Sequence, residues 1–478
     1  MMKHILLLLL AVSLTFATAA QTDSNRAELS KMTVPQYIEQ GSTGGRVSVT
    51  ITNTGIKQLL SFCVRITIDG QEGSGPVHVT GLDSRNLTNG KAYRFSIGYP
   101  LPSTDLGYHT AEITLTNIND NGDTASILSQ LSESYYVYDP AITVPRTTLI
   151  EQFTGYSCPN CPPGEERMKN ATRTYKDIIW ITHHAGYGND PLNSTASQAA
   201  TFFFNNDGST YAPAYMYNRY QVNQNNPGPV THVYTSPTDI RAEINVARNL
   251  PAFVTLGFTD VAFDTATRHY VGHISGRFLS MAPYTRSTRV MLYLVEDSIN
   301  MRQADNSSGS AIWISPYYHM RTVREAPFGT WGKTFAVDEE GYFNIAFDEE
   351  MSADYDYTQC RLVAFLYKYH STNANDCTVL QSATTGNLNH PKLSIDRVGS
   401  DIHLDFYPNP ATTAIHLQSD EGMTLVQLID MRGREVIHSR PADALSTSIS
   451  THNVAAGIYL LRITTATGVT TKRITVTH

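Results

Sequence analysis

The chain has 478 residues with a formal net charge of -8, and 41% of them are hydrophobic. A chain of this length exceeds what one hydrophobic core supports, so several domains are expected. The acidic balance and the lack of a basic stripe argue against nucleic acid as a partner, while the 27 tyrosines favour a β-rich extracellular protein.

A secretory signal peptide is expected over residues 1–20. Lys3 and His4 precede a short apolar run at 5–12, and the small residues at 17–20 provide a cleavage site. The run is too short for a lasting membrane span, and no later segment is long and apolar enough to cross a bilayer. We therefore expect an exported protein with no transmembrane span. The polar stretch at 21–42 is expected to form a loose leader.

Residues 43–140 follow the two-residue period of β-strands. Turn signals such as Asp69-Gly70 and Asn89-Gly90 separate the apolar runs. The expected strands are 46–53, 60–68, 93–99, 110–117 and 134–138. Short strands at this spacing predict an immunoglobulin-like β-sandwich.

Residues 146–250 change to alternating strands and helices. A buried strand is expected at 147–153, followed by Cys158 and Cys161 and then by a helix from Gly164 to Lys176. Further strands are expected at 178–184 and 211–218, and a helix from about 237 to 249, with Ser236 as its N-cap. This alternation predicts an α/β layer.

Residues 251–395 return to a β pattern, and a second β-sandwich is the simplest interpretation. The acidic stretch at 338–356 lacks the ligand spacing of a calcium loop, so a solvated edge is preferred over a calcium site. The whole chain is thus expected to be a multidomain α+β protein, ending in a small β-sandwich over residues 400–478.

That last block resembles the C-terminal sorting domain of the type IX secretion pathway of Bacteroidetes. Four ordered motifs carry the resemblance, at residues 406–412, 430–436, 456–463 and 471–476. The resemblance implies the type IX secretion machinery as a partner. It also implies passage across the outer membrane, commonly with removal of the block and attachment to the cell surface.

The α/β segment resembles a Bacteroidetes outer-membrane-protein family with a thioredoxin-like core. The matching run is Glu151-Gln152-Phe153-Thr154-Gly155-Tyr156-Ser157-Cys158-Pro159-Asn160-Cys161-Pro162, and the likeness covers about 146–390. It implies that Cys158 is the nucleophile, that Cys161 resolves the mixed disulfide, and that Pro213 is a cis-proline facing the cysteine pair. Protein thiols or disulfides would be the substrates.

The five cysteines lie in an oxidising compartment if the chain is exported. Cys158 and Cys161 are expected to pair by proximity. A hairpin near 371–375 would place Cys377 opposite Lys368, so a bridge from Cys377 to Cys360 is not favoured. Cys63 lies in an apolar strand and is expected to be a buried reduced thiol.

Two positions depart from the thioredoxin pattern. Gln152 occupies the place of the buried carboxylate six residues before the first cysteine, and strand alternation directs Glu151 to the opposite face. His183 and His184 end a strand beside the cysteine pair. One could take a proton or hold a metal with the thiolates, but one buried and one exposed histidine is the preferred interpretation. No cofactor or metal motif is found.

Two functions remain open. The first is a surface thiol–disulfide oxidoreductase acting through Cys158 and Cys161. The second is a non-catalytic surface binding or adhesin-like protein in which the disulfide is structural.

Overall fold

The computed structural model describes residues 25–43, 45–119, 127–223, 226–232, 237–280, 287–388, 404–430, 434–442, 444–465 and 469–477. The expected signal peptide at 1–20 and the expected cap Ser236 lie outside the described residues. The chain divides into two units, Met1–Ala141 and Ile142–His478. Each is described by itself.

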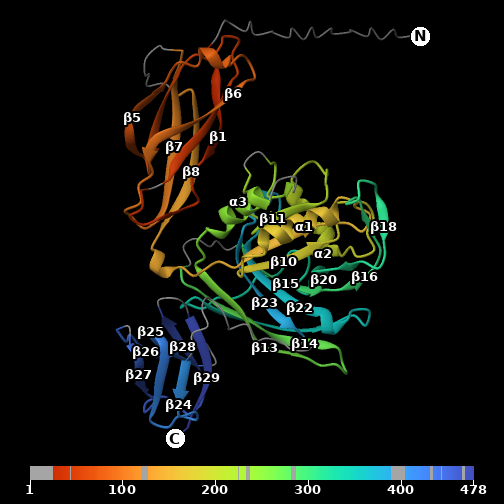
Figure 1. Ribbon diagram of the computed structural model, residues 1–478. Helices are drawn as coiled ribbons and strands as arrows, with labels where there is room; N and C mark the ends of the chain where they lie inside the picture. Colours follow the sequence, from red (N-terminus) through yellow and green to blue (C-terminus); the bar gives the residue numbers. More distant parts are fainter. Residues whose placement is uncertain are drawn as a thin grey trace, which may run out of the picture. The chain divides into compact units, whose positions relative to one another are not determined.

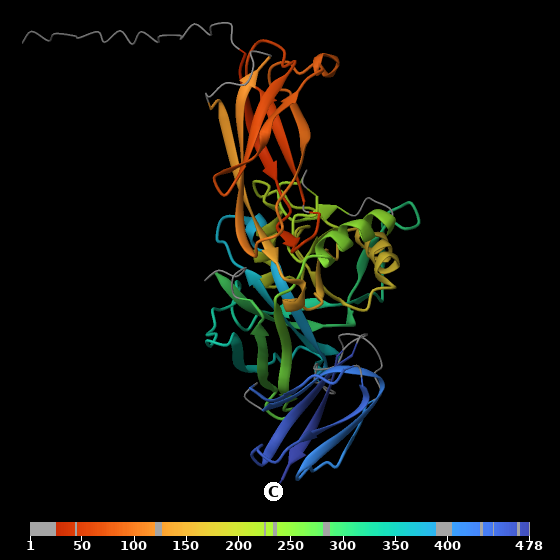
Figure 2. The same ribbon diagram turned by 90° about the vertical axis from the view of Figure 1, so that its left-hand side faces the viewer.

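The N-terminal unit contains two sheets that share one hydrophobic core (Figure 1 and Figure 2). One sheet has the order β1-β3-β6 and the other β2-β8-β7-β4-β5. The strands are β1 (Ala27–Thr33), β2 (Tyr37–Glu39), β3 (Arg46–Asn53), β4 (Phe62–Ile68), β5 (Gln71–Val79), β6 (Ala92–Pro100), β7 (Gly107–Ile118) and β8 (Ser129–Tyr138).

The expected loose leader at 21–42 is wrong from Ala27 onward, since β1 and β2 lie in this stretch. Strand β1 pairs antiparallel with β3, and β2 pairs parallel with β8. Ala27, Leu29 and Met32 are buried in the common core. The polar residues between them face outward, so the segment looks polar in sequence although it supplies a strand.

The second unit is built around an eight-stranded sheet in the order β12-β11-β9-β10-β20-β15-β22-β23. Strand β10 is parallel to both β9 and β20, and the other pairs are antiparallel. The strands are β9 (Thr148–Phe153), β10 (Ile178–His183), β11 (Ala214–Tyr217), β12 (Thr231–His232), β15 (Thr288–Glu296), β20 (Thr322–Glu325), β22 (Cys360–Lys368) and β23 (Val379–Asn387).

Helices cover both faces of this sheet. Helices α1 (Cys161–Thr172) and α3 (Pro237–Arg248) lie side by side (Figure 1) and pack on the face that carries Ile150 and Tyr215. Helix α2 (Thr195–Ala200) and the 3₁₀ turn η3 (Thr201–Phe204) pack on the face that carries Leu149 and Phe153. Strand β9 is therefore buried along its whole length.

Residues 251–395 were expected to form a separate β-sandwich. This is wrong for four of their strands, which belong to the main sheet. Strands β15, β20, β22 and β23 extend the sheet begun by β9 and β10. Strand β15 is buried on both faces for seven consecutive residues, as in the centre of a large sheet with two covered faces. Residues 251–395 also supply a smaller sheet, in the order β13-β14-β21.

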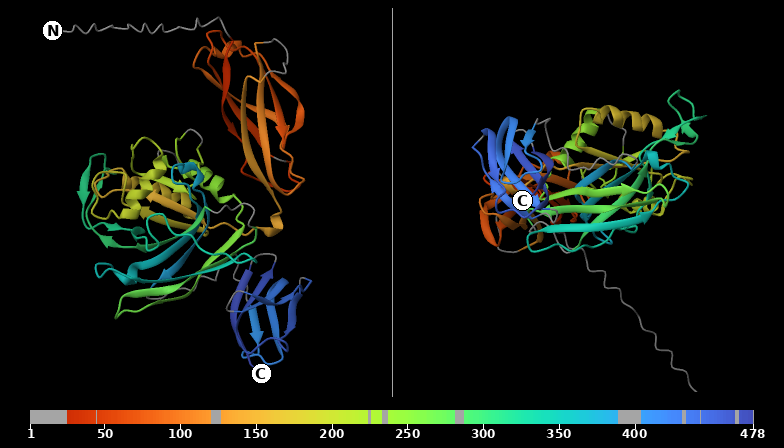
Figure 3. Two further views of the ribbon diagram at one scale, coloured as in Figure 1. Left: turned by 180° about the vertical axis from the view of Figure 1, so that it is seen from behind. Right: turned by 90° about the horizontal axis from the view of Figure 1, so that it is seen from below.

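The smaller sheet lies beside the end of the main sheet formed by β22 and β23 (Figure 1 and Figure 3), where β13 contacts β23. Its strands, β13 (Val254–Phe263), β14 (His269–Phe278) and β21 (Tyr342–Glu350), are antiparallel. Strand β21 alternates between buried and exposed residues from Phe343 to Asp348, so the acidic stretch lies partly on a solvated strand face. Two short pairs join β16 (Ile299–Asn300) to β19 (Tyr318–His319) and β17 (Gln303–Asp305) to β18 (Ile312–Ile314).

The C-terminal block forms a six-stranded sheet with a core of its own. Its strands are β24 (Leu404–Tyr407), β25 (Ala414–Asp430), β26 (Glu435–Ser439), β27 (Ala444–Ser450), β28 (Gly457–Thr465) and β29 (Val469–Val476). Across the described ranges, none of the helices is long and apolar enough to cross a membrane.

Candidate functional site

Cys158 and Cys161 form a disulfide at the start of α1, with their Cα atoms 5.5 Å apart. Strand β9 ends at Phe153, and the loop that follows carries the pair into the helix. The predicted pairing is thus confirmed. Sequence reasoning found it because two cysteines three residues apart at a strand-to-helix junction are a local signal.

The other three cysteines are buried thiols, as predicted for Cys63, and no bridge joins Cys377 to Cys360, as expected. Burial raises the pKa of Cys360 and of Cys377, because a thiolate is poorly solvated in an apolar interior. The Cys63 sulfur lies 3.8 Å from Nε2 of His78. None of these thiols has the electropositive, accessible setting of a reactive cysteine, so Cys158 and Cys161 are the candidates for thiol chemistry.

The disulfide is buried, and the hairpin of β17 and β18, which sequence reasoning missed, contacts the loop that carries it. Cys158 is 1% exposed and Cys161 2%. The backbone N–H of Ala304 donates to the Tyr156 carbonyl at 2.8 Å, and that of Asn306 donates to the Pro159 carbonyl at 3.0 Å. Strands of three residues give no readable period, so the sequence offered no signal for this contact.

Side chains strengthen the hairpin's contact with residues 154–160, the loop between β9 and α1, which we call the cysteine loop. Nε2 of Gln303 donates to the carbonyls of Gly155 at 3.1 Å and Cys158 at 3.0 Å. The Asn306 amide donates to the side-chain oxygen of Asn160. On the outer side, the Trp313 and Tyr156 ring centres are 5.5 Å apart. The hairpin therefore contacts the cysteine loop through polar groups at the backbone and through the aromatic ring of Trp313 at its exposed side.

Pro213 lies against the first turn of α1. A Cβ atom added to Gly164 would be 2.6 Å from Cγ of Pro213 and 2.9 Å from its Cβ. The peptide bond between Ala212 and Pro213 is cis. The structure therefore brings the three predicted site residues, Cys158, Cys161 and Pro213, to one end of α1.

His184 belongs to a buried network beside the cysteine loop. Its Nδ1 lies 2.9 Å from Oδ2 of Asp190, and that same oxygen accepts the Tyr156 N–H at 2.7 Å. Burial tends to raise the pKa of Asp190, but the hydrogen bond and charge of His184 hold it below its usual range. The carboxylate thus fixes both the imidazole and the loop that precedes Cys158.

His319 faces this network from β19, with its ring centre 5.0 Å from that of His184. Burial, and then the charge of His184, lower the pKa of His319 to about 4, so its imidazole is neutral at neutral pH. Its Nε2 is buried and has no hydrogen-bond partner within the described part of the chain. Spacing and periodicity could not place His319 here, since it lies more than 130 residues from His184 in the chain.

The expectation of one buried and one exposed histidine at 183–184 is wrong, because both are buried. His183 points to the α2 side of the sheet, where its ring nitrogens lie 3.1 Å from Ser197 Oγ and 3.2 Å from Glu151 Oε1. The chain after His184 folds back to Asp190 and covers the second ring. In the described ranges, no group of three or more histidine, cysteine or carboxylate side chains could hold a metal ion.

Gln152 and Glu151 point to opposite faces of the sheet, as predicted. Oε1 of Gln152 accepts a hydrogen bond from the indole N–H of Trp180 at 3.1 Å. Glu151 makes two hydrogen bonds with the Arg219 guanidinium, at 2.7 and 2.8 Å. Burial would raise the pKa of Glu151, but the charge and hydrogen bonds of Arg219 lower it to about 2. The only carboxylate in β9 is therefore held ionised in a buried ion pair.

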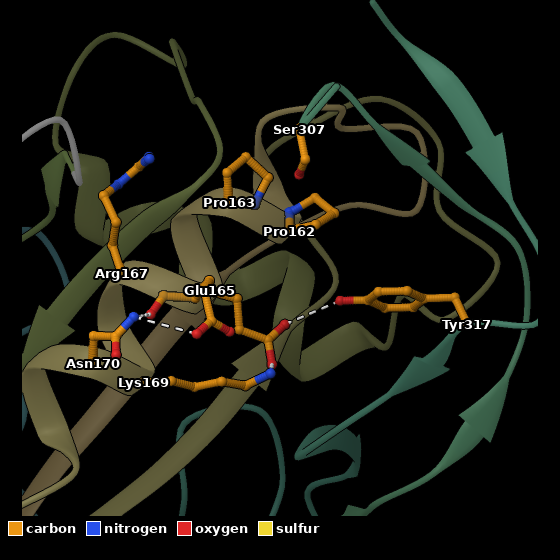
Figure 4. Close-up of a pocket in the computed structure, with 9 residues that line it drawn as sticks. Pro162, Pro163, Glu165, Arg167, Lys169, Asn170, Ser307 and Tyr317 are labelled. Atoms are coloured by element: carbon orange, nitrogen blue, oxygen red, sulfur yellow. Dashed lines mark hydrogen bonds and ion pairs between the residues drawn. The ribbon is translucent and has the colours of Figure 1, made fainter. Parts of the chain in front are cut away.

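A shallow groove of about 420 Å³ runs along the outer face of α1 (Figure 4). Its lining residues are Pro162, Pro163, Glu165, Glu166, Arg167, Lys169, Asn170, Ser307 and Tyr317. Glu165 is fixed by the Tyr317 hydroxyl at 3.2 Å and by Nζ of Lys169 at 3.2 Å. The groove starts next to Cys161, and the loop after β17 contributes Ser307 to its wall.

Comparison with known proteins identifies the C-terminal block. Residues 405–477 match the family model described as the secretion system C-terminal sorting domain. No curated protein sequence matches the chain significantly. Among solved structures, the chain is similar to HBP35 of Porphyromonas gingivalis, with 15% identity and a TM-score of 0.43, over 70% of this chain and 99% of that one.

A second solved structure is similar to a smaller part. The CARDB domain of a Pyrococcus furiosus protein, solved with di-metal ions, matches with 15% identity and a TM-score of 0.16, over 24% of this chain and 91% of that one. The sorting domain is the finding that bears on function. It directs the chain through the type IX machinery, and the protein is exported to the outer-membrane surface or beyond it.

Proposed function

We propose that this exported protein is a thiol–disulfide oxidoreductase built on a thioredoxin-like core within residues 146–250. The observation that carries the proposal is the disulfide at the N-terminus of α1 with Pro213 against the same helical turn. The strand order β12-β11-β9-β10, with β9 and β10 parallel and β11 antiparallel, also supports it. Helices α1 and α3 share one face of these strands.

The reaction is a two-electron exchange between the disulfide and a substrate dithiol. A substrate thiolate attacks the sulfur of Cys158, the Cys158–Cys161 bond breaks, and Cys161 leaves as a thiolate. The second substrate thiolate then attacks the substrate sulfur of the mixed disulfide and releases Cys158. The substrate is oxidised to a disulfide and the protein is reduced to a dithiol. The partial positive charge at the N-terminus of α1 stabilises a thiolate there.

Gln152 supplies no base for the reducing direction. In the reducing direction Cys161 starts as a thiol and must lose its proton before it can attack, which an adjacent carboxylate would assist. Gln152 cannot take that proton, and its oxygen is already hydrogen-bonded to Trp180. In the oxidising direction Cys161 departs as a thiolate and needs no base. The oxidising compartment outside the cell agrees with this direction.

Cys158→Ser should lower the oxidation of a reduced, unfolded protein substrate to the uncatalysed rate. In Cys161→Ser the Cys158 thiolate can attack a substrate disulfide but has no partner to resolve the product, so with an oxidised protein substrate a mixed disulfide should accumulate, visible on a non-reducing gel. The matched control is Cys377→Ser, which removes a buried thiol just before β23 and should leave the rate unchanged. A wild-type rate no faster than that of free cystine, or a Cys158 thiol pKa near 8.5 in the reduced protein, would contradict the proposal.

The second candidate is a non-catalytic surface binding protein with a structural disulfide. The exposed fractions of 1% and 2% for the two cysteines favour it, because a substrate thiol cannot reach sulfur atoms that are buried. Under this candidate, Cys158→Ser lowers the free energy of unfolding, and the wild type gives no exchange above background. The same pair of measurements therefore separates the two functions.

A further inference from the structure

The hairpin of β17 and β18 contacts the cysteine loop through backbone hydrogen bonds, in the way that a strand joins the edge of a sheet. Its N–H groups at Ala304 and Asn306, two residues apart, donate to carbonyls at Tyr156 and Pro159. Donors at alternate residues along one edge are the pattern of a strand pairing with a neighbour. The backbone acceptors beside Cys158 are thus occupied by a segment of the chain itself.

The hairpin is held by few contacts of its own. Strands β17 and β18 form an isolated two-stranded pair of three residues each, and such pairs have little stability by themselves. On β18, Ile312 is 48% exposed and Trp313 49% exposed. Segments with few buried apolar contacts open at lower free energy than the core. The hydrogen bonds to the cysteine loop are therefore a main part of what holds the hairpin in place.

We propose that the β17–β18 hairpin is an autoinhibitory gate that occupies the place of the substrate, an extended polypeptide segment that carries a thiol. This rests on the proposed function of the same disulfide. Opening of the hairpin frees the carbonyls of Tyr156 and Pro159, which then accept N–H groups of the substrate strand. It also exposes the Tyr156 ring, on which an apolar substrate side chain replaces Trp313. Main-chain pairing makes recognition independent of most of the substrate sequence.

Gln303 is the residue that ties the gate most directly to the disulfide. Its buried amide bridges the carbonyls of Gly155 and Cys158. Gln303→Leu leaves both carbonyls without this donor in the closed state, so the open state gains population. We expect dithiothreitol to reduce the disulfide about 10- to 100-fold faster in this variant than in the wild type. Thiol trapping with a maleimide, followed by intact-mass measurement of the full chain, gives the rate.

The matched control is Gln381→Leu. Gln381 is also buried, and its amide also bridges two backbone carbonyls, those of Pro145 and Val254, but it lies on β23. In Gln381→Leu, dithiothreitol should reduce the Cys158–Cys161 disulfide at the wild-type rate. Asn306→Ala, at a partly exposed position, should give a rise of a few fold without loss of folding. Unchanged rates in both hairpin variants, or an equal rise in the Gln381 variant, would overturn the gate.

A second readout separates the gate from the proposed function. If Gln303→Leu also oxidises a reduced, unfolded protein faster than the wild type, both proposals stand. If it reacts faster with dithiothreitol yet oxidises the protein substrate no faster than free cystine, the gate stands and the oxidoreductase function fails. If dithiothreitol reacts no faster while the wild type oxidises substrate, the gate fails and the function stands.

Discussion

Replacing Glu151 by Gln should lower the free energy of unfolding by about 3–5 kcal/mol, because it leaves a buried guanidinium without its counter-charge. Arg219 is 1% exposed, and its positive group lies 4.4 Å from the centre of the Phe203 ring and 4.8 Å from that of Phe365. Aromatic faces attract the cation, but they do not replace a carboxylate with two hydrogen bonds. Urea unfolding followed by tryptophan fluorescence measures the loss.

Tryptophan fluorescence suits this measurement, because the three tryptophans of the chain, Trp180, Trp313 and Trp331, all belong to the second unit. Glu166→Gln is the matched control, since Glu166 is exposed on α1, and it should stay within about 0.5 kcal/mol of the wild type. The double variant Glu151→Gln, Arg219→Met should recover part of the loss by removing the unpaired charge. A free energy of unfolding for Glu151→Gln within about 1 kcal/mol of the wild-type value would contradict a stabilising role of the Glu151–Arg219 pair.

The same ion pair predicts an acid dependence of stability. The pKa of Glu151 falls from an ordinary value near 4.5 in the unfolded chain to about 2 in the folded protein. A depressed pKa means that the unfolded chain binds the proton more readily. The stabilisation is therefore fully present above about pH 4.5 and is lost as the pH falls towards 2. Unfolding measured from pH 6 to pH 2 should show a shallower slope in Glu151→Gln than in the wild type.

Local patterns predicted the parts of the site that depend on neighbours in sequence. The pairing of Cys158 with Cys161 and the opposite faces of Glu151 and Gln152 follow from spacing and strand alternation, and both are found. The sorting block was predictable because four motifs lie in order within 80 residues, and residues 405–477 match its family model.

Contacts between distant segments were beyond these patterns. Arg219 pairs with Glu151 across 68 residues, and its left-handed backbone (φ 50°) gives no sequence signal. Gln303 reaches the Cys158 carbonyl across 145 residues. The boundary expected at 250 failed for a similar reason, since strands of one sheet need not be neighbours in sequence. A buried strand such as β15 has the same apolar sequence pattern whether it begins a new sheet or extends a sheet formed by earlier strands.

Gly164→Ala should lower the free energy of unfolding by about 1–3 kcal/mol, the usual cost of overpacking a tight contact. The same change within a helix normally stabilises it by about 0.5–1 kcal/mol, because alanine loses less backbone entropy than glycine. Here the new methyl group would lie 2.6 Å from Cγ of Pro213. The proline ring cannot rotate away, so α1 and the segment before β11 must separate.

A second alanine variant in the same helix serves as the control for the change in unfolding free energy of Gly164→Ala. Asn170→Ala, at an exposed position of α1, should be neutral or stabilising, since alanine has the higher helix propensity. If Pro213 positions the substrate, Gly164→Ala should also slow the oxidation of a protein dithiol more than the reaction of the disulfide with dithiothreitol, which needs no docking surface. A gain in stability at Gly164 would show that the contact with Pro213 is loose. Pro213 would then hold no fixed place beside the cysteine pair.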